Sequence, residues 1–270
     1  MKKIEVSSIE RTKIVKMYKT GKGTREIAKL FPFSRIVVKR ILKEEDVKMN
    51  NKVPTKYHYN YNTFKVINSR EKAYWLGFLY ADGFVSGRTT GIRLSIRDKK
   101  HLEKFATFIK TNKKVTTGEQ DSFGVITEYA EIRIYSIEIV EDLISLGCVE
   151  RKSLILNFPS KEQVPSKYMN DFIRGYFDGD GSISTNGKSN GFKISIIGTK
   201  DFLQVIKEHF GLKVKLLSQG KVWELKFGGQ LDILSFVNSI YDNEPIKLDR
   251  KYYKSMRIKS KLESSMSAMT

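Results

Sequence analysis

The sequence predicts an α+β protein made of two similar halves that follow a small domain of three helices. Two segments of similar pattern, WLGFLYADG at 75–83 and IRGYFDGDG at 173–181, each lie near the start of a half. Both are followed by alternating strand-like segments and further helical segments. We expect a helical domain over 1–46, a basic linker over 47–63, halves over 64–165 and 166–260, and a tail over 261–270.

Composition restricts the class of protein. The chain has 270 residues, of which 40% are hydrophobic and 29% charged, as in a globular protein with a real core. No apolar run is long enough to span a membrane, and no signal-peptide region opens the chain, so we expect a cytoplasmic protein without a membrane partner. The single Cys148 excludes an internal disulfide.

The net charge of +19 favours a polyanionic partner. Residues 1–60 hold 16 Lys and Arg against 6 Asp and Glu, a net of +10 that leaves +9 for the other 210 residues. A solubilising surface is the alternative, but so uneven a distribution favours nucleic acid.

Residues 8–44 predict three short helices. Thr24 and Ser34 are the expected N-caps of the second and third helices. The apolar residues expected to share their core are Ile9, Ile14, Met17, Ile27, Ala28, Leu30, Val38, Ile41 and Leu42.

The third of these helices leaves Arg35, Lys39 and Arg40 for solvent or phosphate. This arrangement resembles the helix-turn-helix of resolvase-like and homeodomain-like DNA-binding modules. The resemblance implies that the third helix docks in a DNA groove. A generic three-helix packing unit is the alternative.

Five segments alternate with the period of two that is typical of strands, namely 93–97, 131–135, 193–197, 213–217 and 224–227. Their polar faces could reach base edges and phosphates. With the third helix, they give as candidate DNA-binding residues Arg35, Lys39, Arg40, Arg93, Ser95, Arg97, Arg133, Tyr135, Lys193, Ser195, Lys213, Lys215 and Lys226.

Small residues recur at intervals of four in both motifs, at Gly77 and Ala81 and at Gly175 and Gly179. Such a face lets two helices approach closely. Glycine inside a helix costs about 1 kcal/mol relative to alanine, so its presence calls for a packing reason. We therefore expect the two motif helices to pack against each other.

Asp82 and Asp180 end these helices, and each precedes a glycine that can adopt the left-handed cap. Two carboxylates beside two negative helix ends repel each other and raise their pKa values unless a cation joins them. Mg²⁺ takes oxygen ligands and completes its shell with phosphate oxygens. Metal-assisted phosphodiester hydrolysis is the chemistry that this arrangement suits.

The two motifs and the repeated element order resemble the LAGLIDADG homing endonucleases in their single-chain, two-motif form, over about residues 64–258. The resemblance implies two αββαββα halves with saddle-shaped antiparallel sheets. It further implies a monomer that cuts both strands of a long asymmetric DNA target, leaving short 3′ overhangs. The implied cofactor is Mg²⁺, with Mn²⁺ substituting and Ca²⁺ binding without supporting cleavage.

The resemblance also implies roles for individual residues. Asp82 and Asp180 match the metal-binding acids, with the backbone of Ala81 and Gly179 as further metal ligands. The pocket lysines match Lys152 and Lys251, which follow their acids by 70 and 71 residues. Solvated lysines at a helix start are the alternative.

The halves differ at two positions of the pattern. Asp98 matches a polar residue that orders water in the family, whereas Gly198 occupies that position in the second half. Cleavage of the two strands is therefore expected to be unequal. Tyr80 stands where the second motif has Asp178. We do not expect this difference to abolish metal binding.

Two further functions remain open on the same scaffold, a transcriptional regulator and an intron RNA maturase. The paired acids and paired lysines argue against a regulator, which has no need of crowded carboxylates. A maturase, with structured intron RNA as its partner, is harder to separate from a nuclease by residues alone.

Overall fold

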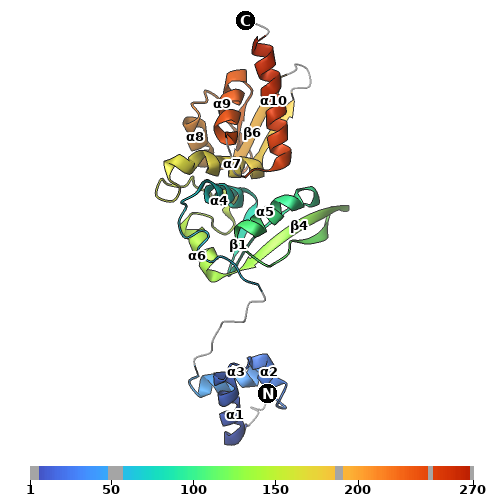
Figure 1. The fold of residues 1–270 in the computed structure, drawn as a ribbon, viewed down its shortest axis with the longest axis vertical. Coiled ribbons are helices and arrows are strands. Elements are labelled where there is room, and N and C mark those ends of the chain that lie inside the picture. The colour runs from blue at the N-terminus through green and yellow to red at the C-terminus, as the bar shows by residue number, and fades with distance from the viewer. Residues whose placement is uncertain (1–5, 48–56, 186–190, 243–245, 268–270) are drawn as a thin grey trace. The chain divides into compact units, whose positions relative to one another are not determined.

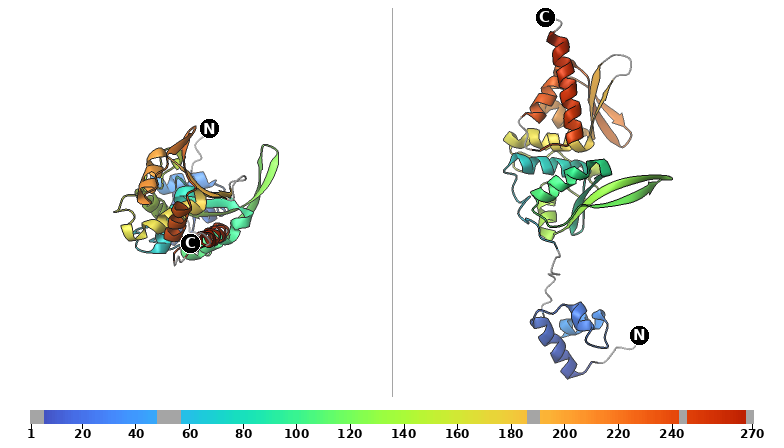
Figure 2. Two further views of the ribbon diagram at one scale, coloured as in Figure 1. Left: turned by 90° about the horizontal axis from the view of Figure 1, so that it is seen from above. Right: turned by 45° about the vertical axis from the view of Figure 1, so that its right-hand side comes forward.

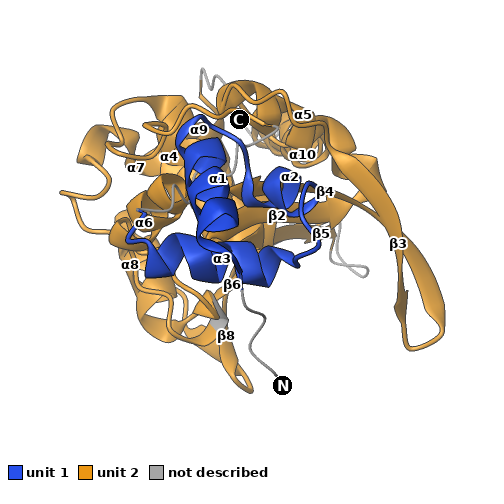
Figure 3. Cartoon of the chain, turned by 90° about the horizontal axis from the view of Figure 1, so that it is seen from below, with its two compact units in different colours: residues 1–56 blue, residues 57–270 orange. Residues whose placement is uncertain are grey.

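The computed structural model describes residues 6–47, 57–185, 191–242 and 246–267. The chain divides into two compact units, residues 1–56 and residues 57–270, which Figure 3 shows in different colours. Within the described residues, no helix is long and apolar enough to cross a membrane.

Unit 1 consists of α1 (Ser8–Lys19), α2 (Thr24–Ala28) and α3 (Arg35–Glu44). Its buried core is formed by Ile14, Ile27, Val37, Val38, Ile41 and Leu42. The inward placement of Ile9 and Leu30 was wrong, because these side chains are 68% and 57% exposed. Leu30 falls outside because α2 ends at Ala28, before another turn could bring it to the core.

Of the two predicted caps of unit 1, Ser34 is confirmed as the N-cap position of α3, whereas Thr24 needs correction. Gly23 precedes α2, so Thr24 is the first residue of the helix rather than its cap. The Thr24 hydroxyl instead accepts a hydrogen bond from Arg35 Nε at 3.0 Å. The cap of α1 is a capping box, in which Ser7 and Glu10 satisfy each other's backbone N–H groups.

Unit 2 contains the two predicted halves (Figures 1 and 2). The elements of the first are α4 (Arg70–Asp82), β1 (Gly83–Ser86), β2 (Thr89–Ser95), α5 (Lys99–Phe108), β3 (Thr116–Ser122), β4 (Val125–Tyr135) and α6 (Ile137–Ser145). The elements of the second are α7 (Met169–Asp180), β5 (Gly181–Thr185), β6 (Phe192–Gly198), α8 (Lys200–His209), β7 (Leu216–Gln219), β8 (Val222–Phe227), α9 (Gln230–Tyr241) and α10 (Asp249–Ser267). The αββαββα order is confirmed in both.

Each half has one four-stranded antiparallel sheet, with the orders β1-β2-β4-β3 and β5-β6-β8-β7. The matching orders show that the second half repeats the topology of the first. Helices α4 and α7 pack against each other where the halves meet (Figure 1). The site at their ends is therefore built from both halves.

The element boundaries differ from the expected ones at three places. Tyr59 and Thr63 are buried in unit 2, so the expected linker ends by Tyr57, and residues 48–56 lie outside the described part. Helix α10 continues to Ser267, through most of the expected tail, because Ile258 and Leu262 are buried along one face of it. Lys213 and Lys215 precede β7 rather than lying in it.

Candidate functional site

The crossing of α4 and α7 depends on the absence of side chains at two glycines. A Cβ atom at Gly77 would lie 2.0 Å from the backbone oxygen of Phe172, and one at Gly175 would lie 1.9 Å from that of Tyr74. Both distances are far inside van der Waals contact. The two helix backbones therefore touch directly at this crossing.

The same close approach brings the acidic ends of the helices together. A Cβ at Gly179 would lie 2.2 Å from Ala81 Cβ and 3.3 Å from Asp82 Oδ2. Gly83 and Gly181 follow the acids with φ of −78° and −82°, so the expected left-handed caps were wrong. The chain instead enters β1 and β5 at once, and added Cβ atoms would collide with Leu79 and Phe177.

The pKa values of both carboxyls are raised. Burial first, and then the charge of Asp180, raise the pKa of Asp82 to about 6. Crowding by protein atoms likewise raises the pKa of Asp180, although one side of this residue stays open to solvent. The Tyr176 hydroxyl hydrogen-bonds to Asp180 and opposes that rise. Lys152 and Lys251 oppose the rise at both acids, yet both pKa values stay raised, which favours a further cation beside them.

Each lysine of the expected pair binds the backbone at the end of its own motif helix. Lys152 Nζ donates to the backbone oxygens of Ala81 and Gly83 at 2.9 and 2.6 Å. Lys251 Nζ donates to the oxygens of Phe177 and Gly179 at 2.7 and 2.8 Å, and to that of Gly181. The structure thus places both lysines at the acids.

Lys251 is the more deeply enclosed of the two lysines, with 6% of its surface exposed. Burial lowers its pKa to about 8, against the opposing attraction of Asp178. Lys152 is only partly buried. The two halves therefore offer unequal ammonium groups to the site.

Asp98 lies in an ion pair with a residue of the other half. Its Oδ1 and Oδ2 accept from Arg250 Nε at 3.0 and 2.9 Å, and only 7% of Asp98 is exposed. Sequence reasoning did not single out Arg250. A signal was available, since Arg151 precedes Lys152 just as Arg250 precedes Lys251.

Asp178, which stands where the first motif has Tyr80, is the centre of a buried hydrogen-bond network. Asp178 accepts hydrogen bonds from Tyr74 at 2.8 Å, Tyr241 at 2.6 Å and the backbone N–H of Leu248 at 2.7 Å. Tyr74 also contacts His101 Nε2 at 2.9 Å. Tyr80, at the matching position, donates to the backbone oxygen of Leu146 in its own half. Both residues thus tie a motif helix to later elements.

The strand residues predicted to contact DNA differ in their exposure. Arg93 and Ser95 are exposed on β2, Tyr135 is exposed on β4, and Arg97 lies in the short turn after β2. Ser195 is buried and donates to Glu224 Oε1 at 2.5 Å. The remaining positions, Arg133, Lys193 and Lys226, are partly exposed.

The donor set at the helix ends fits a hard divalent cation. It offers two carboxylates, which are oxygen ligands of the kind that Mg²⁺ takes. The carbonyls of Ala81 and Gly179, the other expected ligands, already accept hydrogen bonds from Lys152 and Lys251. The described residues contain no group of three or more His, Cys, Asp or Glu side chains that could enclose a metal by themselves. Such an ion would therefore share its shell with water or substrate oxygens.

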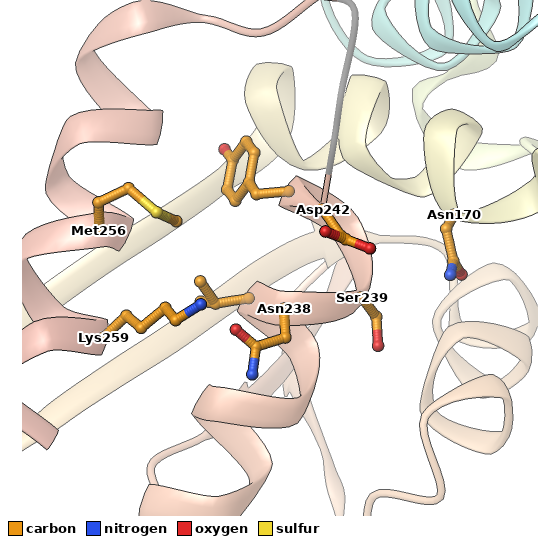
Figure 4. A pocket seen from close by; sticks show the side chains of 8 residues that line it. Asn170, Asn238, Ser239, Asp242, Met256 and Lys259 are labelled. Atoms are coloured by element: carbon orange, nitrogen blue, oxygen red, sulfur yellow. The ribbon is translucent and has the colours of Figure 1, made fainter. Parts of the chain in front are cut away.

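A surface depression of about 410 Å³ lies elsewhere in the second half (Figure 4). Asn170 of α7, Asn238 and Ser239 of α9, and Met256 and Lys259 of α10 line it. It contains neither motif acid.

Comparison with known proteins shows a likeness in one segment of sequence and in the fold. Residues 167–240 match the model of the LAGLIDADG-like domain. The solved LAGLIDADG homing endonuclease I-LtrWI, bound to target DNA, superposes with a TM-score of 0.50 at 12% identity, covering 74% of this chain and 92% of that one. I-GzeII, in complex with its DNA target, superposes with a TM-score of 0.47 at 16% identity, covering 76% of this chain and 93% of that one.

A curated relative is the DNA-directed RNA polymerase subunit Rpo1C of Methanocaldococcus jannaschii. It is 28% identical over 140 residues, which are 52% of this chain. The match spans only 16% of that subunit's length. The chain thus contains a LAGLIDADG-like domain, and unit 2 has the two-half fold of the LAGLIDADG homing endonucleases.

Proposed function

We propose that this protein is a site-specific, metal-dependent DNA endonuclease that cuts both strands of a long asymmetric target. The observation that carries the proposal is the meeting of Asp82 and Asp180 at touching helix ends, with a lysine bound beside each. Two carboxylates with raised pKa values are unfavourable in a purely structural role.

In this proposal the two acids hold the divalent cation, with Mg²⁺ as the natural ion. When bound, the cation supplies an activated water and neutralises charge on the phosphate. Lys152 and Lys251 hold the helix ends in place through the backbone and add positive charge next to the scissile phosphates.

The sheets supply the DNA-binding surface of the proposal. Arg93, Gln120 and Tyr129 lie on the sheet face opposite the helices, since they share that face by register with exposed Ser95. Arg and Gln on a twisted ribbon can pair with base edges in the major groove. The overall charge of +19 favours the phosphate backbone. Double-stranded DNA is therefore the proposed partner, and short 3′ overhangs are the proposed product ends.

The test is a cleavage selection from a pool of randomised duplex DNA, with Mg²⁺ present. We expect one sequence family longer than about one helical turn to be cut on both strands, because two half-sheets would read it. Mn²⁺ should replace Mg²⁺, and Ca²⁺ should support binding alone. Retained binding of DNA with no cleaved sequence under Mg²⁺ or Mn²⁺ would contradict the proposal and favour the regulator. Selective binding of structured RNA instead would favour the maturase.

A further inference from the structure

Arg250 is held beside the acids by a residue of the opposite half. It lies in the first turn of α10, next to Lys251, and its Nε donates to both oxygens of Asp98. A second pair crosses between the same elements, because Lys104 Nζ of α5 contacts Asp249 at 2.8 Å. The start of α10 is thus fixed to the first half at two points.

The guanidinium of Arg250 remains able to bind a further group. The bond to Asp98 uses Nε, and within the described part of the chain Nη1 and Nη2 have no hydrogen-bond partner. The side chain is 41% exposed. Its charge acts on Asp82, since it helps to lower the pKa of that acid. A planar guanidinium with two free donors matches the geometry of a phosphate.

The matching arginine of the first half has no such support. Arg151 precedes Lys152, is exposed, and adopts a left-handed backbone with φ of 51°. Across the described residues it takes part in no ion pair. Asp98 is the N-cap of α5, and the N-cap of the matching helix α8 is Thr199, which has no carboxylate to offer. One arginine is therefore fixed before DNA arrives, whereas the other has to be ordered.

We propose that Asp98 is a positioning residue that fixes Arg250 to receive the phosphate of one DNA strand, so that this strand is cut before the other. The inference rests on the proposed nuclease function and names a specificity of the same site. A pre-positioned cation needs no reorganisation at the moment of reaction, whereas Arg151 loses side-chain freedom on binding. Asp98 acts through Arg250 and does not itself touch the substrate.

The test measures each strand separately, on a duplex recovered from the selection and labelled at either 5′ end. With saturating protein and Mg²⁺, the wild type should cut one strand at least about fivefold faster than the other. Asp98→Ala and Arg250→Ala should each slow the fast strand by roughly tenfold or more, and the slow strand much less. The double variant should be no slower than Arg250→Ala, because both changes remove the same positioned guanidinium.

Controls separate this role from simple attachment of the two halves. Lys104→Ala breaks the neighbouring cross-half pair and should leave the ratio of strand rates unchanged. Asp98→Asn keeps the shape of the side chain and serves if Asp98→Ala lowers the melting temperature. In Asp98→Ala and Arg250→Ala, the affinity for DNA measured in EDTA should change by a smaller factor than the rate of cleavage of the fast strand.

Equal rates for both strands in the wild type would overturn the inference. Equal slowing of both strands by Asp98→Ala would also overturn it. So would a double variant whose fast-strand rate is lower than that of Arg250→Ala alone. Absence of any cleavage by the wild type would instead defeat the proposed function.

Discussion

At the scale of the residue, the central feature is a pair of carboxyls whose pKa values are both raised. Burial and Asp180 raise the pKa of Asp82 from its usual 3.8 to about 6. At Asp82, the folded, metal-free protein therefore binds more protons than the unfolded chain between about pH 4 and pH 6. The contribution of Asp82 to stability falls as the pH rises through that window, and its penalty is fully present above pH 6.

Replacing Asp82 by Asn should raise the melting temperature of the metal-free protein at pH 8, because the charge penalty is removed. The difference from wild type should shrink as the pH falls toward 4. Thermal unfolding in EDTA at several pH values measures this. Asp201→Asn, which changes an exposed acid of α8, should show no comparable gain. A lower melting temperature for Asp82→Asn at pH 8 would contradict the prediction, because it would mean that the folded protein stabilises the charged Asp82 carboxylate.

Divalent cations should reverse the order of melting temperatures between the wild type and Asp82→Asn. Mg²⁺ should raise the melting temperature of the wild type by binding to the folded state, and raise that of Asp82→Asn much less. The measurement reads metal binding without requiring a DNA target. Equal stabilisation of both proteins by Mg²⁺ would place the metal elsewhere.

At the scale of the element, the α4–α7 pair depends on bare backbone at the crossing. Gly175→Ala should destabilise unit 2 by about 1–3 kcal/mol or more, as overpacking does, although alanine is the better helix former. Ser260→Ala, on the exposed face of α10, is the matched control and should be neutral or slightly stabilising. Denaturant unfolding measures both. A neutral Gly175→Ala would show that the helices can separate without loss.

Helix α3 should matter for DNA binding if unit 1 is a helix-turn-helix module. Lys39→Ala on α3 should weaken binding more than Lys13→Ala on α1, although both remove one exposed charge. Fluorescence anisotropy with a selected duplex measures the two affinities in EDTA. Equal small losses would indicate that unit 1 contributes only general charge.

The sequence predicted these elements unevenly, for physical reasons. The motif helices were recognisable because glycine is unfavourable inside a helix unless packing requires it, as at Gly77 and Gly175. Leu30 was misplaced because the early end of α2 depends on the following turn rather than on apolar spacing. The pair of Asp98 with Arg250 was invisible because it joins residues 152 positions apart, which no local pattern encodes.

At the scale of the whole molecule, a net charge of +19 should make DNA binding strongly dependent on salt. A protein that neutralises six to ten phosphates loses about 10³–10⁵ in affinity between 50 and 200 mM salt. We expect a loss of at least about 10³ for this chain on a selected duplex. A loss below tenfold in a salt titration would show that the basic residues are mostly remote from the DNA.

The most direct measurement of the central claim is cleavage and binding by Asp180→Asn on the selected duplex. This change keeps the size of the side chain and removes one of the two charges at the touching helix ends. Cleavage of both strands should be abolished, while affinity for the duplex in EDTA should stay within about threefold of wild type. Undiminished cutting by Asp180→Asn would contradict the assignment of the paired acids to the reaction.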